Sequence, residues 1–326
     1  MQVTSRFLKF QWVVLVLLFL VVFAGSFVRM SGSGMGCPDW PKCFGKWVPP
    51  TELTELPANY RETYLLKRQK KVEKFCRFLN ALGMHETAVR IQTNPDVYVE
   101  EAFNAKKTWT EYLNRVVGFL AGNAMLIAFV WMLAVYRKSK FILLMLLNLL
   151  LMGVEGWFGS IVVATNLVPW TITVHLFLAL VIIGIQLYLV YSMGRGSQTN
   201  LVLNRSMRMI LWLILIITFY QMFLGTQVRE SIDYLVKQGY SRTEWMDKIG
   251  IEFLIHRSFS WLVLILLAWM FWKNEQTTKY KIIRWTFVVL ALELISGVLL
   301  AYVDMPGLVR TSHLIFASVL FGMMLF

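Results

Sequence analysis

Eight long apolar segments restrict the fold of this chain more than any other feature. They fall near residues 8–29, 112–135, 140–164, 170–193, 207–228, 251–272, 282–303 and 308–326. An α-helix needs roughly 20 apolar residues to cross the hydrocarbon core of a bilayer. With 57% hydrophobic and 16% charged residues among 326, the chain has more apolar surface than a soluble domain of this length buries. We therefore predict an all-α membrane protein with eight transmembrane helices.

The loops after the second, fourth and sixth segments are rich in basic residues, which predicts their side of the membrane. These residues are Arg137, Lys138 and Lys140, then Arg195, Arg205 and Arg208, then Lys273, Lys279, Lys281 and Arg284. By the positive-inside rule they are cytoplasmic, together with the amino terminus. The net charge of +13 follows from this pattern, so no nucleic-acid partner is expected. The absence of an Arg/Ser-rich transit segment favours the bacterial cytoplasmic membrane.

The two halves of the chain repeat one another. Glu155, Gly159 and His175 have the same spacings as Glu293, Gly297 and His313. Asn114-Arg115 in the first half corresponds to His256-Arg257 in the second. Gly25, Val28 and Arg29 recur as Gly225, Val228 and Arg229. Cleavage of the first segment as a signal peptide would delete one member of the repeat, so we expect it to be retained. We predict two tandem four-helix bundles, residues 1–193 and 194–326, related by a pseudo-twofold axis along the membrane normal.

Four positions of the repeat lie at one predicted depth. Asn114, His175, His256 and His313 each fall in the first turns of a segment that begins on the outer side. An ionisable residue inside a membrane marks a functional site by default, and histidine is a common metal and haem ligand. His85 lies in the long outer loop, where we expect an ordinary surface residue. The site is therefore predicted to bind a metal or haem near the outer face.

Haem suits these residues better than zinc. No carboxylate or thiol pattern completes a four-ligand zinc set, whereas haem needs one or two axial imidazoles in an apolar slot. In the second half, His256 and His313 can hold an iron from both faces, as in an electron relay. In the first half, Asn114 stands at the position of His256, so a haem held by His175 alone keeps one face open for oxidation chemistry.

Charged residues near these positions have two open interpretations. Glu111 lies one helical turn before Asn114, where the second half has Phe253, and this difference favours a role in proton handling over a solvated helix start. Arginines follow the same repeat. Arg29 and Arg115 in the first half, and Arg229 and Arg257 in the second, either pair with haem propionates or simply reach the membrane interface.

The segment Val28-Arg29-Met-Ser-Gly-Ser-Gly-Met-Gly-Cys37-Pro-Asp-Trp40-Pro41-Lys-Cys43 resembles the first outer loop of the haem A synthases. Glu111-x-x-Asn114-Arg115 and the three membrane histidines fit the helices of that family. The resemblance implies an enzyme that oxidises the C8 methyl group of haem O to a formyl group through a hydroxymethyl intermediate. It also implies haem b as an electron relay between His256 and His313, and haem O bound by His175 with Glu111 among the catalytic residues.

The resemblance further suggests partners and a disulfide. Haem O synthase, terminal oxidase assembly factors, membrane lipid and an unidentified electron acceptor are the expected partners. Cys37 and Cys43 lie six residues apart in the oxidising compartment, which suits a short disulfide loop, and the resemblance agrees. Both a structural and a redox-active role stay open for this bond. Cys76 has no evident mate, and Glu155 and Glu293 are expected to hydrogen-bond between helices.

Two departures from the family pattern stand out. Asn114 replaces the family's usual first histidine, so bis-histidine ligation cannot hold in the substrate half. Residues 50–108 form a long charged insertion with predicted helical stretches such as 62–82. A cover over the pocket, a docking surface and simple elaboration are all open roles for it.

Other functions also agree with the pattern. A membrane b-type cytochrome that only transfers electrons would bind haem in both halves and would not need Glu111. A transporter built from parallel repeats would depend on polar groups at the membrane midplane, whereas the histidines here cluster near one face.

Overall fold

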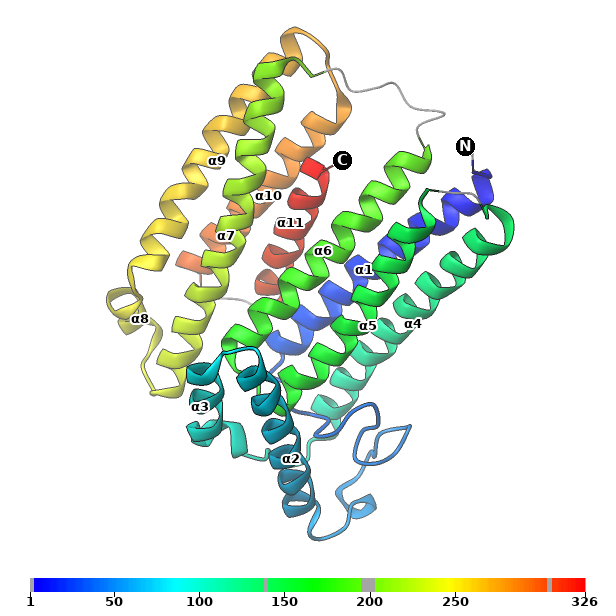
Figure 1. The fold of residues 1–326 in the computed structure, drawn as a ribbon. Coiled ribbons are helices and arrows are strands. Elements are labelled where there is room, and N and C mark those ends of the chain that lie inside the picture. The colour runs from blue at the N-terminus through cyan, green and yellow to red at the C-terminus, as the bar shows by residue number, and fades with distance from the viewer. Residues whose placement is uncertain (1–2, 138–139, 195–202, 304–306, 326) are drawn as a thin grey trace. The chain divides into compact units, whose positions relative to one another are not determined.

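The computed structural model describes residues 3–137, 140–194, 203–303 and 307–325, and it is helical with one isolated β-bridge, Cys43 to Lys46, within those ranges. In these described ranges, eight helices are long and apolar enough to cross a membrane: α1 (Ser5–Met30), α4 (Ala105–Val135), α5 (Ile142–Ala164), α6 (Pro169–Gly194), α7 (Arg205–Lys237), α9 (Ile251–Gln276), α10 (Lys281–Tyr302) and α11 (Gly307–Leu325) (Figure 1). The predicted all-α membrane fold with eight spans is confirmed. Lys138 and Arg195 of the basic loops, and Phe326 at the end of the last predicted segment, lie outside the described residues.

The chain divides into two compact units, each of which is described by itself. The first unit is Thr4–Gln186 and the second is Leu187–Phe326 with Met1–Val3. The division falls within α6, a few residues before the border predicted from the repeat. That border, at residues 193 and 194, and the pseudo-twofold relation of the halves stay predictions.

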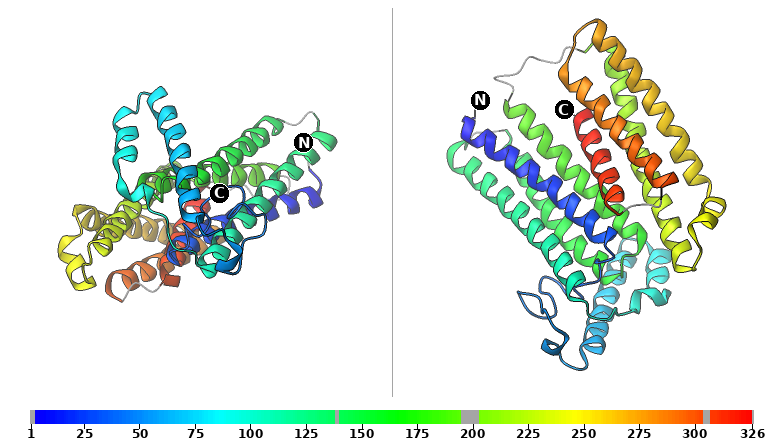
Figure 2. Two further views of the ribbon diagram at one scale, coloured as in Figure 1. Left: turned by 90° about the horizontal axis from the view of Figure 1, so that it is seen from below. Right: turned by 180° about the vertical axis from the view of Figure 1, so that it is seen from behind.

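Buried polar side chains connect three helices of the first unit. The α1 helix lies along α4, as the right-hand view of Figure 2 shows. Nε2 of Gln186 on α6 donates to Oε1 of Gln11 on α1 at 2.8 Å, and Nδ2 of Asn148 on α5 reaches Oε1 of Gln186 at 3.4 Å. Because buried polar groups in a membrane helix need partners, these contacts tie three helices together.

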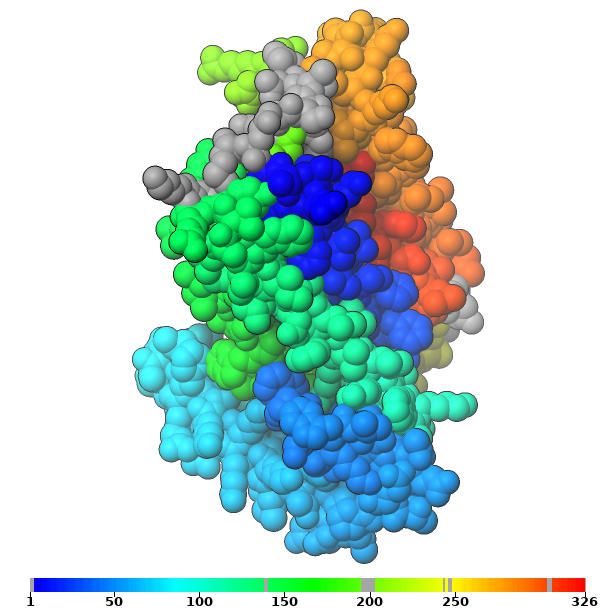
Figure 3. All heavy atoms as spheres, turned by 90° about the vertical axis from the view of Figure 1, so that its right-hand side faces the viewer, coloured from blue at the N-terminus to red at the C-terminus, as the bar shows by residue number. Residues whose placement is uncertain are grey.

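The long insertion folds as a separate layer at one end of the first unit. It contains η1 (Leu53–Glu55), α2 (Tyr60–Ala81), α3 (His85–Thr93) and η2 (Pro95–Tyr98), and α2 confirms the helix predicted near 62–82. The ring of Phe75 stacks on Trp170, while Phe78 meets Trp157 edge-on. Figure 3 shows the insertion (blue to cyan) covering the lower ends of the green helices. The insertion therefore packs on the ends of α5 and α6.

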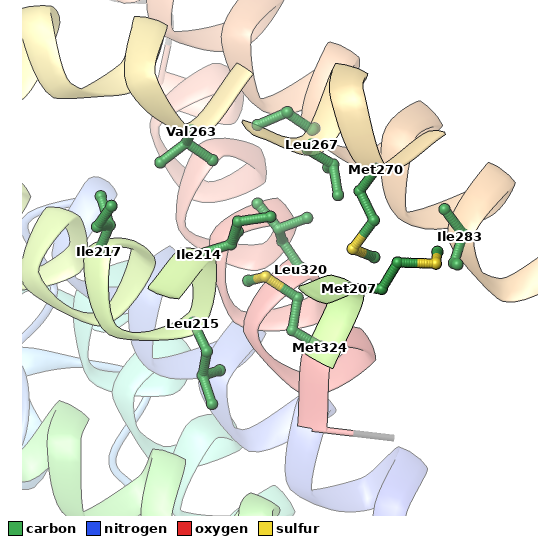
Figure 4. Packing of buried hydrophobic residues seen from close by; sticks show 11 residues of the cluster. Met207, Ile214, Leu215, Ile217, Val263, Leu267, Met270, Ile283, Leu320 and Met324 are labelled. Carbon is green, nitrogen blue, oxygen red and sulfur yellow. The ribbon is translucent and has the colours of Figure 1, made fainter. Parts of the chain in front are cut away.

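The second unit has an apolar core to which four helices contribute. Figure 4 shows side chains of α7, α9, α10 and α11 meeting in this core. Its fully buried members include Ile214 and Leu267. The short α8 (Arg242–Lys248) begins with a capping box, in which Ser241 and Glu244 exchange hydrogen bonds and satisfy free backbone donors. These helices provide a fixed frame for the residues on α9 and α11.

Candidate functional site

Glu111 is the centre of a buried polar cluster at the start of α4. Its side chain is only 3% exposed. Oε2 accepts a 2.7 Å hydrogen bond from the backbone N–H of Cys37, and Oε1 accepts one of 2.5 Å from Nη2 of Arg115. Both carboxylate oxygens thus have a donor, which holds the group in one orientation.

Arg115 joins Glu111 to the loop that follows α1. Its guanidinium donates to the carbonyl oxygens of Cys37 at 2.9 Å, Asp39 at 2.5 Å and Lys42 at 3.0 Å. The planar fork of arginine suits such multiple acceptance by neighbouring carbonyls. The propionate role predicted for Arg115 stays a prediction, and the structure places its guanidinium among these loop carbonyls.

The loop itself is closed by the disulfide between Cys37 and Cys43, whose Cα atoms lie 4.9 Å apart. This pairing confirms the predicted bond. The loop backbone meets α4 closely, since a Cβ at Gly36 would lie 2.5 Å from the carbonyl of Lys107. Oγ1 of Thr108 donates to the Gly36 carbonyl at 2.8 Å. The disulfide loop is therefore docked on the helix that carries Glu111.

His175 on α6 faces a carboxylate and a glycine of α5. Its Nδ1 lies 3.0 Å from Oε1 of Glu155, and a Cβ at Gly159 would lie 3.2 Å from Cε1 of the ring. The Nδ1 atom is buried and, apart from this close contact with Glu155, has no hydrogen-bond partner among the described residues, yet 36% of the side chain is accessible. The accessible part of the imidazole is thus on the side away from Glu155. Phe158 stacks beside the ring, with centroids 6.4 Å apart.

His256 on α9 and His313 on α11 face each other in the second unit. Their ring centroids lie 6.5 Å apart and their planes cross at 82°. Imidazoles that bind one metal ion from opposite sides, through bonds of about 2.0 Å, have ring centres roughly 6 Å apart. Nδ1 of His313 lies 3.2 Å from Oε1 of Glu293 and 2.8 Å from Oγ of Ser296. Nδ1 of His256 is buried, and the ring lies near the backbone of Gln221 on α7.

Each of the four predicted site positions packs against a glycine. Cβ atoms built on the glycines would lie 3.2 Å from Cε1 of His175, 3.3 Å from Cε1 of His313, 3.5 Å from Cε1 of His256 and 3.9 Å from Oδ1 of Asn114; the glycines are Gly159, Gly297, Gly225 and Gly25 respectively. At Gly159 and Gly297 a side chain would crowd the imidazole. The repeat in the sequence thus corresponds to a repeated helix contact within each unit.

Arginines lie at the same end of the second unit as the histidines. Arg229 pairs with Asp233, with Nη2 to Oδ1 at 2.8 Å. Arg310, three residues before His313, lies within electrostatic range of both, and no residue in the described ranges hydrogen-bonds to its buried Nε. The guanidinium of Arg257 lies over the ring of Phe253 at 5.7 Å. Arg29 lies in the last turn of α1, the helix of the first unit that packs on α4.

The donor set of the second unit fits haem. Within the described ranges, no group of three or more His, Cys, Asp and Glu side chains is placed to hold a metal ion. Two facing imidazoles without further protein ligands suit an iron that already has four porphyrin nitrogens. The buried Nε of Arg310, to which no described residue hydrogen-bonds, is a donor of the kind that binds a carboxylate.

The fold and these residues define a multi-pass helical membrane protein with histidine sites that suit haem. The chain belongs to the COX15-CtaA family of cytochrome oxidase assembly proteins, whose model matches residues 9–79 and 84–325. It is similar to the "Heme A synthase" of Wolbachia pipientis subsp. Culex pipiens, with 22% identity over 91% of this chain and 89% of that protein. The "Heme A synthase" of Wolbachia sp. subsp. Brugia malayi is 23% identical over 94% and 91% of the two chains. No solved structure matches the chain.

Two residues of the site were not found from the sequence. Ser296 lies beside His313. The matching position of the first half is occupied by Phe158, so the repeat did not indicate Ser296. Arg310 precedes His313 by three residues, and this spacing on one helix face could have identified it.

Proposed function

We propose that the chain is a haem A synthase, an oxidoreductase that converts the C8 methyl group of haem O into a formyl group through a hydroxymethyl intermediate. The product has one more oxygen and two fewer hydrogens than the substrate. The observation that carries the proposal is the facing pair His256 and His313, 6.5 Å apart at 82°, in a member of this family. Relatives named Heme A synthase support the choice of reaction.

In the second unit, His256 and His313 would hold haem b by both faces of its iron. Bound there, haem b supplies one-electron transfer, and it has no face open to substrate. Arg229 and Arg257 would bind the propionates, and we add Arg310, whose buried Nε has no hydrogen-bond partner among the described residues. This half acts as the relay for electrons leaving the substrate.

In the first unit, haem O is the substrate and His175 would hold its iron. Asn114 is a poor iron ligand, so the second face stays open. The side chain of His175 is 36% exposed, so part of the imidazole is accessible for binding an iron. Arg29 and Arg115 are the residues predicted to pair with the propionates of haem O.

Glu111 is the residue we propose for proton handling during oxidation. Its carboxylate is held by the Cys37 N–H and by Arg115, so it is fixed before substrate arrives. Removing protons from a methyl carbon as it becomes a formyl group requires a base near the reacting substituent. Glu111 is catalytic in this proposal, whereas Arg115 and the Cys37 loop position it.

The proposed setting is the bacterial cytoplasmic membrane, with the amino terminus in the cytoplasm and the haem sites near the outer face. Eight apolar helices support a multi-pass protein surrounded by lipid. Haem O synthase and terminal oxidase assembly factors are proposed partners, together with an electron acceptor of unknown identity.

Haem extraction from the purified protein, made in cells that supply haem O, tests the proposal. Mass spectrometry should detect haem b together with a product of haem O that carries the added oxygen. His256→Ala and His313→Ala should each remove the stable haem b spectrum, whereas His175→Ala and Glu111→Ala should keep much of it and abolish turnover. A protein without Soret absorbance, or one that leaves haem O unchanged, contradicts the proposal.

A membrane b-type cytochrome is the second candidate, because the facing histidines alone would suffice for electron transfer. A shuttle of this kind would bind haem stably in both halves and would keep its function after Glu111→Gln. It would also release haem O with its mass unchanged. The same extraction experiment therefore separates the two functions.

A further inference from the structure

Each half of the chain places a buried carboxylate against the Nδ1 atom of a histidine. Oε1 of Glu155 lies 3.0 Å from Nδ1 of His175, and Oε1 of Glu293 lies 3.2 Å from Nδ1 of His313. The side chains of Glu155 and Glu293 are 7% and 14% exposed. A contact that recurs in both halves, with the same atoms and nearly the same distance, is part of how each site is built.

Ser296 identifies the tautomer of His313. Its hydroxyl donates to the backbone carbonyl of Glu293 at 2.7 Å, which uses its only proton. Oγ must therefore accept in its 2.8 Å contact with Nδ1 of His313. Nδ1 carries the proton in this arrangement, and Nε2 keeps the lone pair that a metal needs.

The first half lacks this hydroxyl. Phe158 occupies the position that matches Ser296, and its ring stacks beside His175. In the part of the chain that the structure describes, Oε1 of Glu155 is the side-chain oxygen that approaches Nδ1 of His175, at 3.0 Å. The carboxylate alone can accept the Nδ1 proton there.

We propose that Glu155 and Glu293 are positioning residues that accept the Nδ1–H of His175 and His313, so that each imidazole presents Nε2 to a haem iron. The inference rests on the proposed function, which supplies the haems. A carboxylate at Nδ1 makes the imidazole a stronger donor, and a stronger donor favours ferric over ferrous iron. Both haems are therefore held at lower reduction potential than histidine without a charged acceptor would give.

The two halves differ in how they tolerate loss of the carboxylate. His313 has two acceptors, Glu293 and Ser296, and either keeps the proton on Nδ1. His175 has Glu155. We therefore expect Glu155→Gln to weaken iron binding in its half more than Glu293→Gln does in the other.

Redox titration of the purified holoprotein tests the second half. The midpoint potential of haem b should rise in Glu293→Gln, and it should rise further in Glu293→Gln/Ser296→Ala. Ser318→Ala is the matched control, because Ser318 also lies on α11's buried side and donates to a backbone carbonyl, that of Leu314, at 2.8 Å. The control should keep the wild-type potential.

Resonance Raman spectra of the ferrous substrate haem test the first half. The iron–histidine stretching frequency should fall in Glu155→Gln, because a weaker acceptor at Nδ1 weakens the bond through Nε2. Ser160→Ala, on the same helix, should leave the frequency unchanged, since Ser160 bonds to the carbonyl of Trp157. Glu155→Asp is the rescue variant and should restore part of the shift.

The outcomes separate this inference from the proposed function. A wild-type protein without haem overturns both. A wild-type protein that holds haem, with unchanged potential in the double variant and unchanged frequency in Glu155→Gln, overturns the positioning role alone. Should Glu293→Gln fail to accumulate, Glu155→Gln still decides: its iron–histidine frequency must fall below that of Ser160→Ala, and equal frequencies contradict the inference.

Discussion

The backbone N–H of Cys37 donates a 2.7 Å hydrogen bond to Oε2 of Glu111, although 74 residues separate them in the chain. The contact joins the disulfide loop to the helix with the predicted catalytic carboxylate. The position of the Glu111 carboxylate therefore depends on the fold of the loop as well as on α4. A substitution that displaces the disulfide loop should displace Glu111, and one that removes the Glu111 carboxylate should loosen the loop.

Glu111→Gln should reduce turnover of haem O by about a hundredfold or more, because removing a residue that transfers protons typically costs that much. The amide is the same size and can accept from the Cys37 N–H, so the loop should stay in place. The measurement is product formation by mass spectrometry beside the haem b spectrum. Glu101→Gln is the control, because Glu101 pairs with Lys107 at the surface. This variant should keep the wild-type turnover. Full turnover in Glu111→Gln would contradict the catalytic role.

Loss of the disulfide should loosen the loop that holds Glu111. Replacing Cys37 and Cys43 by alanine should lower the free energy of unfolding of the first unit by about 2 kcal/mol, from the loop-closure entropy of a short ring. Turnover should fall in parallel, since the Cys37 N–H and carbonyl orient Glu111 and Arg115. Denaturant unfolding and product assays measure the two effects. Cys76→Ala, in the apolar core of the insertion, should keep turnover, and loss of turnover there would argue against a specific effect of the disulfide.

The sequence indicated the membrane fold and suggested four positions for the proposed site, because apolar length and repeat spacing can be read along the chain. It could not pair Cys37 with Glu111, since that contact depends on how a loop docks on a distant helix. It gave Glu155 and Glu293 only a general role between helices. The distances to His175 and His313 follow from the approach of neighbouring helices at Gly159 and Gly297, which spacing along the chain does not specify.

A buried ion pair in the insertion gives a prediction for stability and pH. Nη2 of Arg68 lies 2.9 Å from Oε1 of Glu100, and its Nη1 donates to the Val99 carbonyl at 2.6 Å. Arg68→Ala should destabilise the insertion by about 3–5 kcal/mol, because it leaves a buried carboxylate without its cation. Limited proteolysis and denaturant unfolding measure the loss. Arg77→Ala, which breaks the exposed pair with Glu73, should cost at most about 0.5 kcal/mol.

The pH dependence of the Arg68→Ala variant follows from Glu100. Burial raises the pKa of Glu100 above its usual value of 4.5, while Arg68 opposes that rise. Without Arg68 the pKa should rise further, so the folded variant binds a proton at a pH where the unfolded chain does not. The stability of the variant relative to wild type should therefore recover as the pH falls toward 4.5, and a deficit independent of pH would contradict this account.

Gly159 provides a test of the contact between α5 and His175. A methyl group there would lie 3.2 Å from Cε1 of the imidazole, closer than ordinary contact allows. Gly159→Ala should displace the ring by a few tenths of an ångström and lower turnover on the order of tenfold, since catalysis is sensitive to such misplacement. Gly156→Ala is a matched control on the same helix, because a Cβ there has no neighbour within 4 Å. Equal turnover in the two variants would show that His175 is not set by this contact.

Asn114 gives the final test of how the substrate iron is held. Oδ1 of Asn114 would lie 3.9 Å from a Cβ at Gly25, much as Cε1 of His256 would lie 3.5 Å from one at Gly225. An imidazole at position 114 should therefore fit in the way His256 does. Asn114→His should convert the substrate haem from five-coordinate to six-coordinate low-spin iron, visible in optical and electron paramagnetic resonance spectra, because two imidazoles then bind one iron. Asn114→Leu, similar in size and without a ligand atom, should stay five-coordinate. A low-spin substrate haem in the unaltered protein would mean that another group already fills this face, and the open side assigned to haem O would be wrong.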